Sequence, residues 1–451
     1  MTSYELCLCR WVRTVFVGLC GSGFISTVMA EPVAFQAPRF IDVNAVTLRD
    51  CVLRAFDHDP VIAQMVAQIG IGQALIDEAK SAWHPQLSLQ SGLGGSSGNS
   101  SRQDNRYNDT RYGLTLTQLV YDFGKTQNTI LQQQDIKQGY IYSLQQTLGD
   151  VASRTAKTYL LIKRYAALKR VAEQGVKSLQ VVERIAKIRA NSGLSSRSDY
   201  LQAQSRIASL QAQAEQFTTQ RETAIAQLEV LTGVRAATFA EPPQALNGQT
   251  MHVAAIDYSA IAAVKKARVE AEAAAKAIEK NKAGYLPTIQ LQAGRTRYQN
   301  SNDPYWDNQI YLNLDVPLYT GGAVSARIAQ AVDAKRAADE GINTAKFDAM
   351  TRAATAQANY NGARSRYRVS VRQVGIAQHA RSVYLDEYKL SRRSVNDLVT
   401  VEQDLHQSKL SLRNAEFDRW DAAVDYAAAV DRLVNVLNIH SFEPLEALPD
   451  R

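Results

Sequence analysis

The feature that most constrains this chain is an internal duplication, in which motifs of the first half return 198 residues later. The segment Ser198-Asp199-Tyr200-Leu201 returns as Asn396-Asp397-Leu398-Val399. The segment Tyr121-Asp122-Phe123-Gly124 returns as Tyr319-Thr320-Gly321-Gly322. Self-similarity at a fixed distance indicates that one structural unit is built twice.

A heptad seam follows the same shift and predicts helices that pack sideways against one another. Apolar or small residues spaced by three and four form a stripe on one helix face, which must be covered by a second helix. In the first copy the seam comprises Tyr200, Ala203, Ile207, Leu210, Ala214, Phe217, Arg221, Ala224, Leu228 and Leu231. In the second copy it comprises Leu398, Val401, Leu405, Ser408, Leu412, Ala415, Arg419, Ala422, Tyr426 and Ala429. Even the arginine that interrupts the seam is duplicated.

The first thirty residues predict a secretory signal peptide that is cleaved before Glu31. Arg10 and Arg13 precede an apolar stretch from residue 15 to residue 29, which is the order of the charged and apolar regions of a signal peptide. The stretch is short and contains glycines, so cleavage is favoured over an N-terminal membrane anchor. The mature protein is therefore expected outside the cytoplasm.

Composition excludes several classes of protein. Without the signal the chain has 49 basic and 43 acidic side chains, a net charge of +6, and these are interspersed on helix faces rather than gathered into a nucleic-acid groove. No later segment approaches the roughly 18 consecutive apolar residues of a membrane helix. Any membrane crossing must therefore use strands. Cys51 is the only cysteine left, so no intrachain disulfide is expected, and its apolar helical neighbours predict a small buried hydrophobe.

The patterns divide the chain into five parts. They are the signal peptide (1–30), a first repeat (31–240), an inter-repeat bridge (241–256), a second repeat (257–440) and a C-terminal tail (441–451). Residues 31–46 contain prolines and predict an irregular leader before Thr47, an N-cap candidate. The first helix ends at Asp59-Pro60, and a second runs to about Trp83. The bridge is either a simple linker or a belt packed around the helices.

Four segments alternate apolar and polar residues with a period of two, which predicts two β-hairpins. They span about residues 85–95 and 111–121 in the first repeat, and about 287–299 and 308–318 in the second. Each is near the length of a membrane-spanning strand, and the polar faces carry the hydroxyl and amide groups that suit a wet lumen. A soluble hairpin is the alternative. Membrane-spanning strands are favoured over a soluble hairpin, because no other strand is expected to complete a soluble sheet and because aromatic residues cluster at the strand ends.

The remaining chain predicts two long helical hairpins. No proline occurs from about residue 126 to 190, or from about 323 to 390, so each stretch predicts a helix on the order of 100 Å long. Turn residues at about 191–198 and 391–396 reverse the chain. The returning helices carry the two heptad seams.

Four strands cannot close a barrel, because closure takes about eight or more. Unpaired strand edges are prohibitive in hydrocarbon, so several chains must contribute if these strands cross a membrane. Two chains would give eight strands and a lumen filled by side chains, whereas three would give twelve strands and room for water. A homotrimer is the smallest assembly expected to conduct, with its apolar sides towards lipid.

Taken in order, the motifs resemble the TolC-like outer-membrane factor family over essentially the whole mature chain. They are Asp59-Pro60, Asp122-Phe123-Gly124, Tyr319-Thr320-Gly321-Gly322 and the two aspartate-containing turns. The resemblance implies a mainly α fold with transmembrane β: a trimeric 12-stranded β-barrel continued by an α-helical periplasmic tunnel. It also implies an outer-membrane export duct for type I secretion or drug efflux, docked by a periplasmic adaptor protein and an inner-membrane transporter, with no catalysis of its own.

The resemblance further implies a periplasmic gate at the tips of the helical hairpins. Asp397 would join a ring of acidic side chains, Tyr388 would reach Asp199 of the neighbouring hairpin, and Arg393 would contact the turn near Ser198. Carboxylates around an axis repel one another and attract cations, so weak contacts between the hairpins must keep the gate closed. For Asp199 and Asp397, helix capping is a compatible alternative. Thr400 stands where a second acidic residue is expected, which implies weaker cation selectivity.

No pattern predicts an enzyme, a cofactor or a metal site. The six histidines have no ligand spacing, and no phosphate loop or nucleophile motif occurs. The rival interpretation is a periplasmic coiled-coil adaptor or structural protein that bridges envelope partners without a pore. Adaptors carry one helical hairpin flanked by many β segments, whereas two hairpins and four strands are expected here. The cargo, a protein or a small toxic compound, stays open because selection lies in the inner-membrane partner.

Overall fold

The computed structural model describes residues 40–97, 106–193, 196–246, 256–299, 304–390 and 392–439. The expected signal peptide and C-terminal tail lie outside the described residues, as do parts of the hairpin loops and of the bridge. No helix in the described ranges combines the length and apolarity needed to cross a bilayer.

Two short helices open the described chain, and their ends are fixed by side-chain caps. Helix α2 spans Leu48–His58 and α3 spans Pro60–Ser81. The Thr47 hydroxyl accepts a hydrogen bond from the Asp50 backbone N–H (3.2 Å), and the Asp50 carboxylate accepts one from the Thr47 N–H (3.2 Å). Asp59 ends α2 and caps α3 by accepting from the Val61 N–H at 2.9 Å. The Asp59-Pro60 pair therefore ends α2 and begins α3 within two adjacent residues.

Two helical hairpins form most of the molecule. Helices α4 (Lys125–Asn191) and α7 (Ala323–Lys389) each contain 67 residues, and each is about 100 Å long at 1.5 Å per residue. They return as α5 (Arg197–Thr232) and α8 (Val395–Ala429). The predicted heptad seams are confirmed, because every seam position on α5 and α8 is buried or half-buried.

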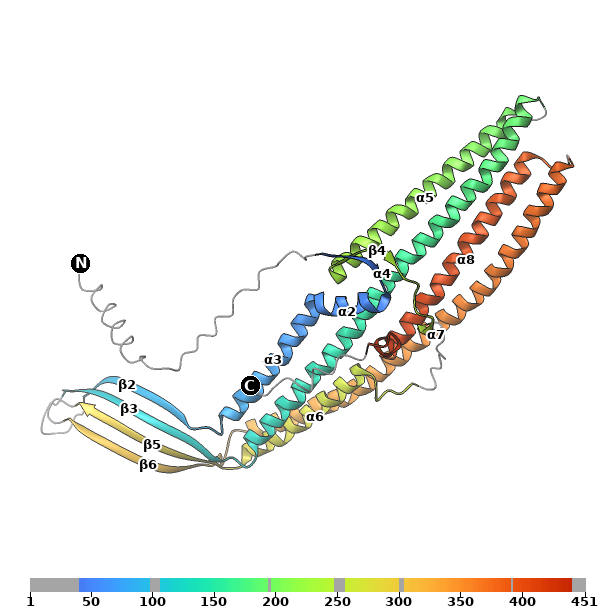
Figure 1. Ribbon diagram of the computed structural model, residues 1–451. Helices are drawn as coiled ribbons and strands as arrows, with labels where there is room; N and C mark the ends of the chain where they lie inside the picture. Colours follow the sequence, from blue (N-terminus) through green and yellow to red (C-terminus); the bar gives the residue numbers. More distant parts are fainter. Residues whose placement is uncertain are drawn as a thin grey trace, which may run out of the picture. The chain divides into compact units, whose positions relative to one another are not determined.

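The helices lie side by side in one layer (Figure 1). Helix α6 spans Ala262–Lys282 and the short α9 spans Leu433–Val436. Towards the hairpin tips the order across the layer is α5, α4, α8, α7, and towards the strands it is α3, α4, α6, α7. Helix α7 is therefore outermost on one side of the layer, and α3 and α5 are outermost on the other.

The two predicted β-hairpins join into one antiparallel sheet with the order β2-β3-β5-β6. Its strands are β2 (Gln86–Ser97), β3 (Arg106–Tyr121), β5 (Thr288–Gln299) and β6 (Tyr305–Asp315). Strands β2 and β3 continue into the segment expected as a loop, because their Gly, Ser and Asn residues pair across the hairpin. Strand β6 starts and ends three residues earlier than expected. Strands β2 and β6 are the edges of this sheet.

The leader and the end of the first repeat hold two strands that the sequence interpretation missed. Strand β1 (Ile41–Val46), expected as irregular leader, pairs in parallel with β4 (Val234–Phe239). The described part of the chain therefore has six strands, not four. In the bridge, the 3-10 turn η1 (Gln244–Leu246) buries Leu246 completely. The described bridge residues are thus packed against the helices rather than a free linker.

The largest apolar core lies where this small sheet meets α2, α4, α5 and α8. Cys51 contributes to it with an exposed fraction of 2%, which confirms its role as a small buried hydrophobe, and burial raises the pKa of its thiol to about 12. Tyr159 of α4 is fully buried, and its hydroxyl faces the carbonyls of Val46 (3.2 Å) and Ala240 (2.6 Å). One side chain thus ties both strands of the small sheet to the longest helix of the first repeat.

We predict that Tyr159→Phe lowers the free energy of unfolding by about 1–3 kcal/mol, because the Ala240 carbonyl loses its hydroxyl donor, whereas the Val46 carbonyl keeps the Ala240 backbone N–H at 3.1 Å. Denaturant titration of the purified protein, followed by circular dichroism, measures the change. Tyr165→Phe on the same helix is the control, since Tyr165 donates no side-chain hydrogen bond within the described residues. Equal stabilities of the two variants would refute the role given to Tyr159.

Candidate functional site

The strand register divides the four-stranded sheet into an apolar face and a polar face. Residues paired directly across antiparallel strands point to the same side, and one such row is Leu87, Leu116, Ala293 and Ile310. The apolar face holds Leu87, Leu89, Leu93, Leu114, Leu116, Ile289, Leu291, Ala293, Ile310, Leu312 and Leu314. The polar face holds Gln86, Ser88, Gln90, Thr115, Thr117, Gln290, Gln292, Thr296, Gln309 and Asn313. The predicted alternation is therefore kept in register across all four strands.

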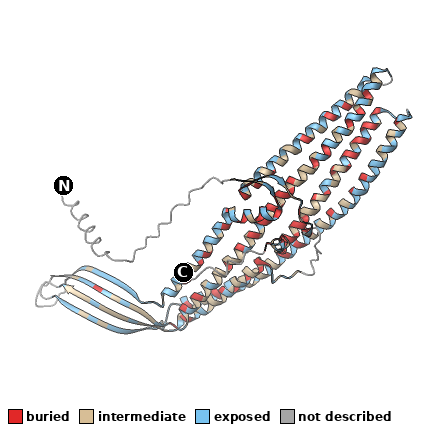
Figure 2. Cartoon of the chain, in the orientation of Figure 1, coloured by how far each residue is buried: buried red, intermediate tan, exposed pale blue. Residues whose placement is uncertain are grey.

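Burial differs between the two faces of the sheet, although its strands are mostly exposed or half-buried (Figure 2). Along β3, Leu114 and Leu116 are exposed, whereas Gly113 is buried and Thr115 is half-buried. A Cβ atom added at Gly113 would lie only 2.5 Å from the Thr296 Oγ1 atom of the neighbouring strand. Side chains crowd on the inside of a curved sheet, so the polar face is the concave one.

Each second strand turns into its long helix through a left-handed corner. Phe123 and Gly124 have φ angles of 53° and 88°, and their counterparts Gly321 and Gly322 have 62° and 80°. Glycine adopts this conformation without strain, whereas Phe123 does not. The buried Asp122 carboxylate stabilises the first corner by accepting hydrogen bonds from the backbone N–H groups of Gly124 (3.2 Å) and Thr126 (2.7 Å). The duplicated motif therefore forms the corner at which a strand turns into a long helix.

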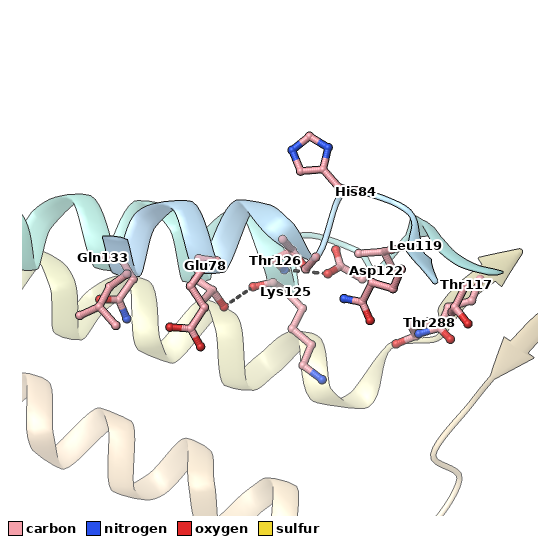
Figure 3. A pocket seen from close by; sticks show the side chains of 15 residues that line it. Glu78, His84, Thr117, Leu119, Asp122, Lys125, Thr126, Gln133 and Thr288 are labelled. Carbon is pink, nitrogen blue, oxygen red and sulfur yellow. Dashed lines mark hydrogen bonds between the residues drawn. The ribbon is translucent and has the colours of Figure 1, made fainter. Parts of the chain in front are cut away.

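An open pocket of about 490 Å³ lies at this corner, between the strands and the start of the helices (Figure 3). Strand residues of the polar face, including Thr117 and Gln290, line one part of it. Helix residues Glu78, Lys125 and Gln133 line the other part. The polar side of the sheet thus leads directly onto a polar surface of α3 and α4. Among the described residues, no cluster of His, Cys, Asp and Glu is arranged to hold a metal ion.

At the hairpin tips, Asp199 and Asp397 occupy equivalent positions in the first turns of α5 and α8. Ser196 and Ser394 are the N-caps. The Asp397 carboxylate accepts from the Ser394 N–H (3.0 Å), and hydrogen bonds from Ser394 hold the pKa of this carboxyl below its usual value. Ser198 bonds only locally, with its Oγ 2.7 Å from that of Ser196. Asp397 is therefore part of a capping box, the compatible alternative foreseen for it.

Tyr388 and Arg393 make contacts that differ from those expected. The Tyr388 hydroxyl is buried without a hydrogen-bond partner in the described part of the chain, so it does not reach Asp199. Its ring instead lies under the Arg189 guanidinium, whose Cζ is 5.2 Å from the ring centroid. Arg393 donates to Glu387 (2.8 Å) and stacks on a neighbouring tyrosine rather than contacting the Ser198 turn.

The two tips are held together by contacts that the sequence did not indicate. The Arg189–Tyr388 stack joins the end of α4 to the end of α7. Gln202 of α5 donates to the Asn396 Oδ1 of α8 at 2.9 Å. An apolar tip cluster fills the space between them, and it comprises Leu179, Val182, Ala186, Ala203, Ile207, Tyr388, Val395, Leu398 and Val399. Both hairpins contribute to this cluster, so separating the tips would expose it.

Thr400 lies exposed on α8, and its hydroxyl donates to the Asn396 carbonyl at 3.0 Å. Glu402 is buried and forms an ion pair with Arg381. The nearest acidic side chain on the helix is thus neutralised inside the hairpin. A second ring of free carboxylates at this level is not available from either residue.

Further from the tips, polar contacts again join the two hairpins. The buried His406 of α8 lies 2.9 Å from the Gln213 amide oxygen of α5. Arg164 of α4 donates to Asp418 (2.7 Å) and to Asp421 (2.9 Å) of α8. Burial raises the pKa of Asp421 to about 6, although Arg164 opposes the shift. These contacts lie between unlike positions of the two repeats, so the duplication alone could not reveal them.

Comparison with known proteins gives a consistent result. A model of the outer membrane efflux protein family matches residues 53–234 and 262–438. The outer membrane protein TolC of Escherichia coli is 23% identical over 95% of this chain and 85% of its own length. The proteases secretion protein PrtF of Dickeya chrysanthemi is 33% identical over 32% of each chain. The fold is similar to that of the MtrE outer membrane channel of Neisseria gonorrhoeae, with a TM-score of 0.71, 16% identity and coverage of 87% of this chain and 89% of that chain.

We predict that Asp421→Asn changes how stability depends on pH. Because the pKa of Asp421 is raised, the folded state keeps a proton that the unfolded state releases between about pH 4 and 6. The contribution of this group to stability is therefore fully present below about pH 4 and is lost as the pH rises through 6. The variant should therefore gain stability relative to the wild type between pH 4 and 7, by at most about 3 kcal/mol, since one pKa unit corresponds to about 1.4 kcal/mol. Denaturant titrations at several pH values measure the difference. A difference that stays constant or falls would contradict the assignment.

Proposed function

The chain belongs to the outer membrane efflux protein family and is an outer-membrane efflux or secretion channel, and we propose that three copies form its conducting unit. The observation that carries this proposal is the four-stranded sheet with one apolar face, one polar face and two free edges. In lipid, every backbone N–H and C=O group must find a partner within protein. The edges of β2 and β6 can be satisfied only by the same strands of further copies.

The strand count selects the number of copies. Two copies would give eight strands, whose lumen side chains would fill, whereas three give twelve strands and space for water. Curling towards the polar face supports a lumen lined by amides and hydroxyls, with the leucine-rich face towards lipid. The outer strand of one subunit, β6, then pairs with β2 of the next.

The helical layer supports the same closure. Its outermost helix α7 exposes large apolar side chains on the side away from α8, including Phe347 (63% exposed) and Ile376 (72% exposed). The opposite edge exposes Val66 of α3 and Val230 of α5. Such unpartnered apolar edges are typical of surfaces that pack in an assembly. Placing α7 of one copy against α3 and α5 of the next closes a periplasmic ring under the barrel.

The pocket at the strand-to-helix corner supports a continuous path through this assembly. Polar side chains such as Thr117, Gln290 and Lys125 lead from the concave face of the sheet to the surfaces of α3 and α4, with Leu75 and Leu119 among them. Cargo would enter at the hairpin tips, where a periplasmic adaptor and an inner-membrane transporter dock. TolC and PrtF are relatives of this chain, and the name of PrtF supports a secreted protein as one class of cargo.

We infer that the tips form the gate, with roles that follow the observed contacts. Three copies of Asp199 and Asp397 would ring the axis, and their mutual repulsion favours opening. The Arg189–Tyr388 stack and the apolar tip cluster oppose that repulsion within each subunit. Ser198 and Arg393 shape the turns that a docking partner would touch. A partner that replaces these weak links would open the tunnel without breaking the helices.

The alternative of a poreless adaptor or structural protein is not favoured. The match to an outer membrane efflux family covers both repeats, and the fold is that of outer-membrane channels. The amphipathic sheet also has no core of its own on either face among the described residues, as a soluble domain would require.

We predict that Ile376→Asp prevents trimer formation, because the charge would be placed in the apolar contact between neighbouring helical layers. Size-exclusion chromatography with light scattering, in mild detergent, should give monomers or a trimer fraction reduced at least tenfold. Gln378→Asp is the control, since Gln378 is exposed and lies about half a turn away from Ile376, on a different face of α7. A stable Ile376→Asp trimer would remove α7 from the proposed interface.

We predict that Tyr388→Ala raises single-channel conductance in planar bilayers at least twofold, because the aromatic support under Arg189 is lost. Tyr388→Phe should leave the conductance unchanged, since it keeps the ring and removes only a hydroxyl that bonds nothing in the described structure. A Tyr388→Phe channel as open as Tyr388→Ala would instead favour a hydroxyl link to Asp199. Unchanged conductance in both variants would exclude Tyr388 from the gate.

A further inference from the structure

Two arginines interrupt the apolar face of the four-stranded sheet. The register places Arg295 and Arg297 of β5 on the same side as Ile289, Leu291 and Ala293. Arg295 is exposed and Arg297 is half-buried. If this face meets lipid, as the proposed function requires, both guanidinium groups lie where apolar side chains are the rule.

Both guanidinium groups contact the same aromatic ring. The Cζ atom of Arg295 lies 4.3 Å from the ring centroid of Trp306, and that of Arg297 lies 5.3 Å from it. Trp306 pairs directly with Arg297 across the β5–β6 ladder, and Tyr112 of β3 flanks Arg297 on the other side. The arginines are thus held side by side by cation–π contacts instead of being free to turn away from the sheet.

No acidic side chain balances these two charges on the described strands. The carboxylates of β5 and β6, Asp307 and Asp315, alternate onto the polar face. Neither arginine forms an ion pair within the described part of the chain, where the contacts of their guanidinium groups are those with the Trp306 ring. An arginine on the lipid side of a barrel costs about 2–4 kcal/mol at the midplane and about 0–1 near the interface. A neighbouring pair without a counter-ion on these strands is therefore placed to attract an anion from outside the protein.

The position of the pair along the strand indicates which anion is available. Arg297 lies eight residues from Ile289, which is about 26 Å along the strand at 3.3 Å per residue, or about 20 Å along the membrane normal at the usual tilt. This distance is close to the height of an apolar barrel band. Because the helices leave the opposite end of the sheet towards the periplasm, the pair lies at the outer border, where lipid head groups begin.

We propose that Arg295 and Arg297, held against Trp306, bind a phosphate group of lipopolysaccharide in the outer leaflet. The planar guanidinium matches two phosphate oxygens at once, and adjacent arginines can share one phosphate from two directions. The indole ring offers an apolar surface to the acyl chains below the head group. Each subunit of the trimer carries one such site, and this inference rests on the proposed barrel.

The test measures lipid binding to the purified, delipidated full-length channel by native mass spectrometry. The probes are lipid A with both phosphates and lipid A from which the phosphates have been removed. The wild type should bind up to one diphosphorylated lipid A per chain. The affinity should fall at least tenfold for the dephosphorylated lipid, and at least tenfold for the Arg295→Gln/Arg297→Gln double variant.

The matched control is Arg111→Gln, which removes a positive charge at the same end of the sheet but from the polar face. Its lipid A affinity should equal that of the wild type. The proposal is overturned if the double variant binds as well as the wild type, or if Arg111→Gln loses as much affinity. If the double variant fails to assemble, the comparison of the two lipids on the wild type decides, and equal binding overturns the proposal.

Conductance separates this inference from the function on which it rests. A wild type that forms no conducting trimer in planar bilayers would contradict the proposed function. A wild type and double variant that conduct equally, with lipid A binding indifferent to phosphate and to the arginines, would contradict only the lipid site.

Discussion

The requirement that backbone hydrogen bonds be satisfied within a bilayer determines most of this structure. A sheet of four strands leaves the N–H and C=O groups of β2 and β6 unpaired, and hydrocarbon offers them no partner. Closure with further copies removes these edges, and the same symmetry must then close the helical layer between α7 and the α3–α5 edge. In the proposed trimer the polar face becomes a lumen and the leucine face meets lipid, so a charge on the leucine face is placed to bind an anion of the membrane.

Because the unit is duplicated, one chain supplies two strand pairs and two helical hairpins with few specialised residues. The corner after each hairpin uses consecutive left-handed residues to turn a strand into a helix of 67 residues. The two hairpins then differ where they face each other. Arg164 meets two aspartates of α8, and Arg189 covers the Tyr388 ring. Similar halves give a continuous layer, and the unlike contacts between them hold the two hairpins together.

Much of the fold could be predicted because its signals are local. Proline-free stretches and glycine turns predicted the long helices, and strict alternation predicted the four strands together with their apolar and polar faces. The strands β1 and β4 were missed because each has six residues and their parallel pairing joins segments about 190 residues apart. The site was less predictable. Asp199 and Asp397 lie in the first turns as expected, but Tyr388 contacts Arg189 of α4, about 200 residues away in the chain, and Arg393 turns back onto Glu387 of α7.

The number of chains per barrel is the central claim, and disulfide trapping between strand edges in intact cells tests it most directly. Gln90→Cys on β2 is combined in turn with a cysteine at position 307, 309 or 311 of β6, while the buried Cys51 stays unreactive. Within one chain these strands are three strand spacings, about 14 Å, apart, so an intrachain disulfide cannot form. The account predicts that at least one pair yields covalent trimers and nothing larger on oxidation. Monomers from every pair, or ladders beyond three chains, would contradict it.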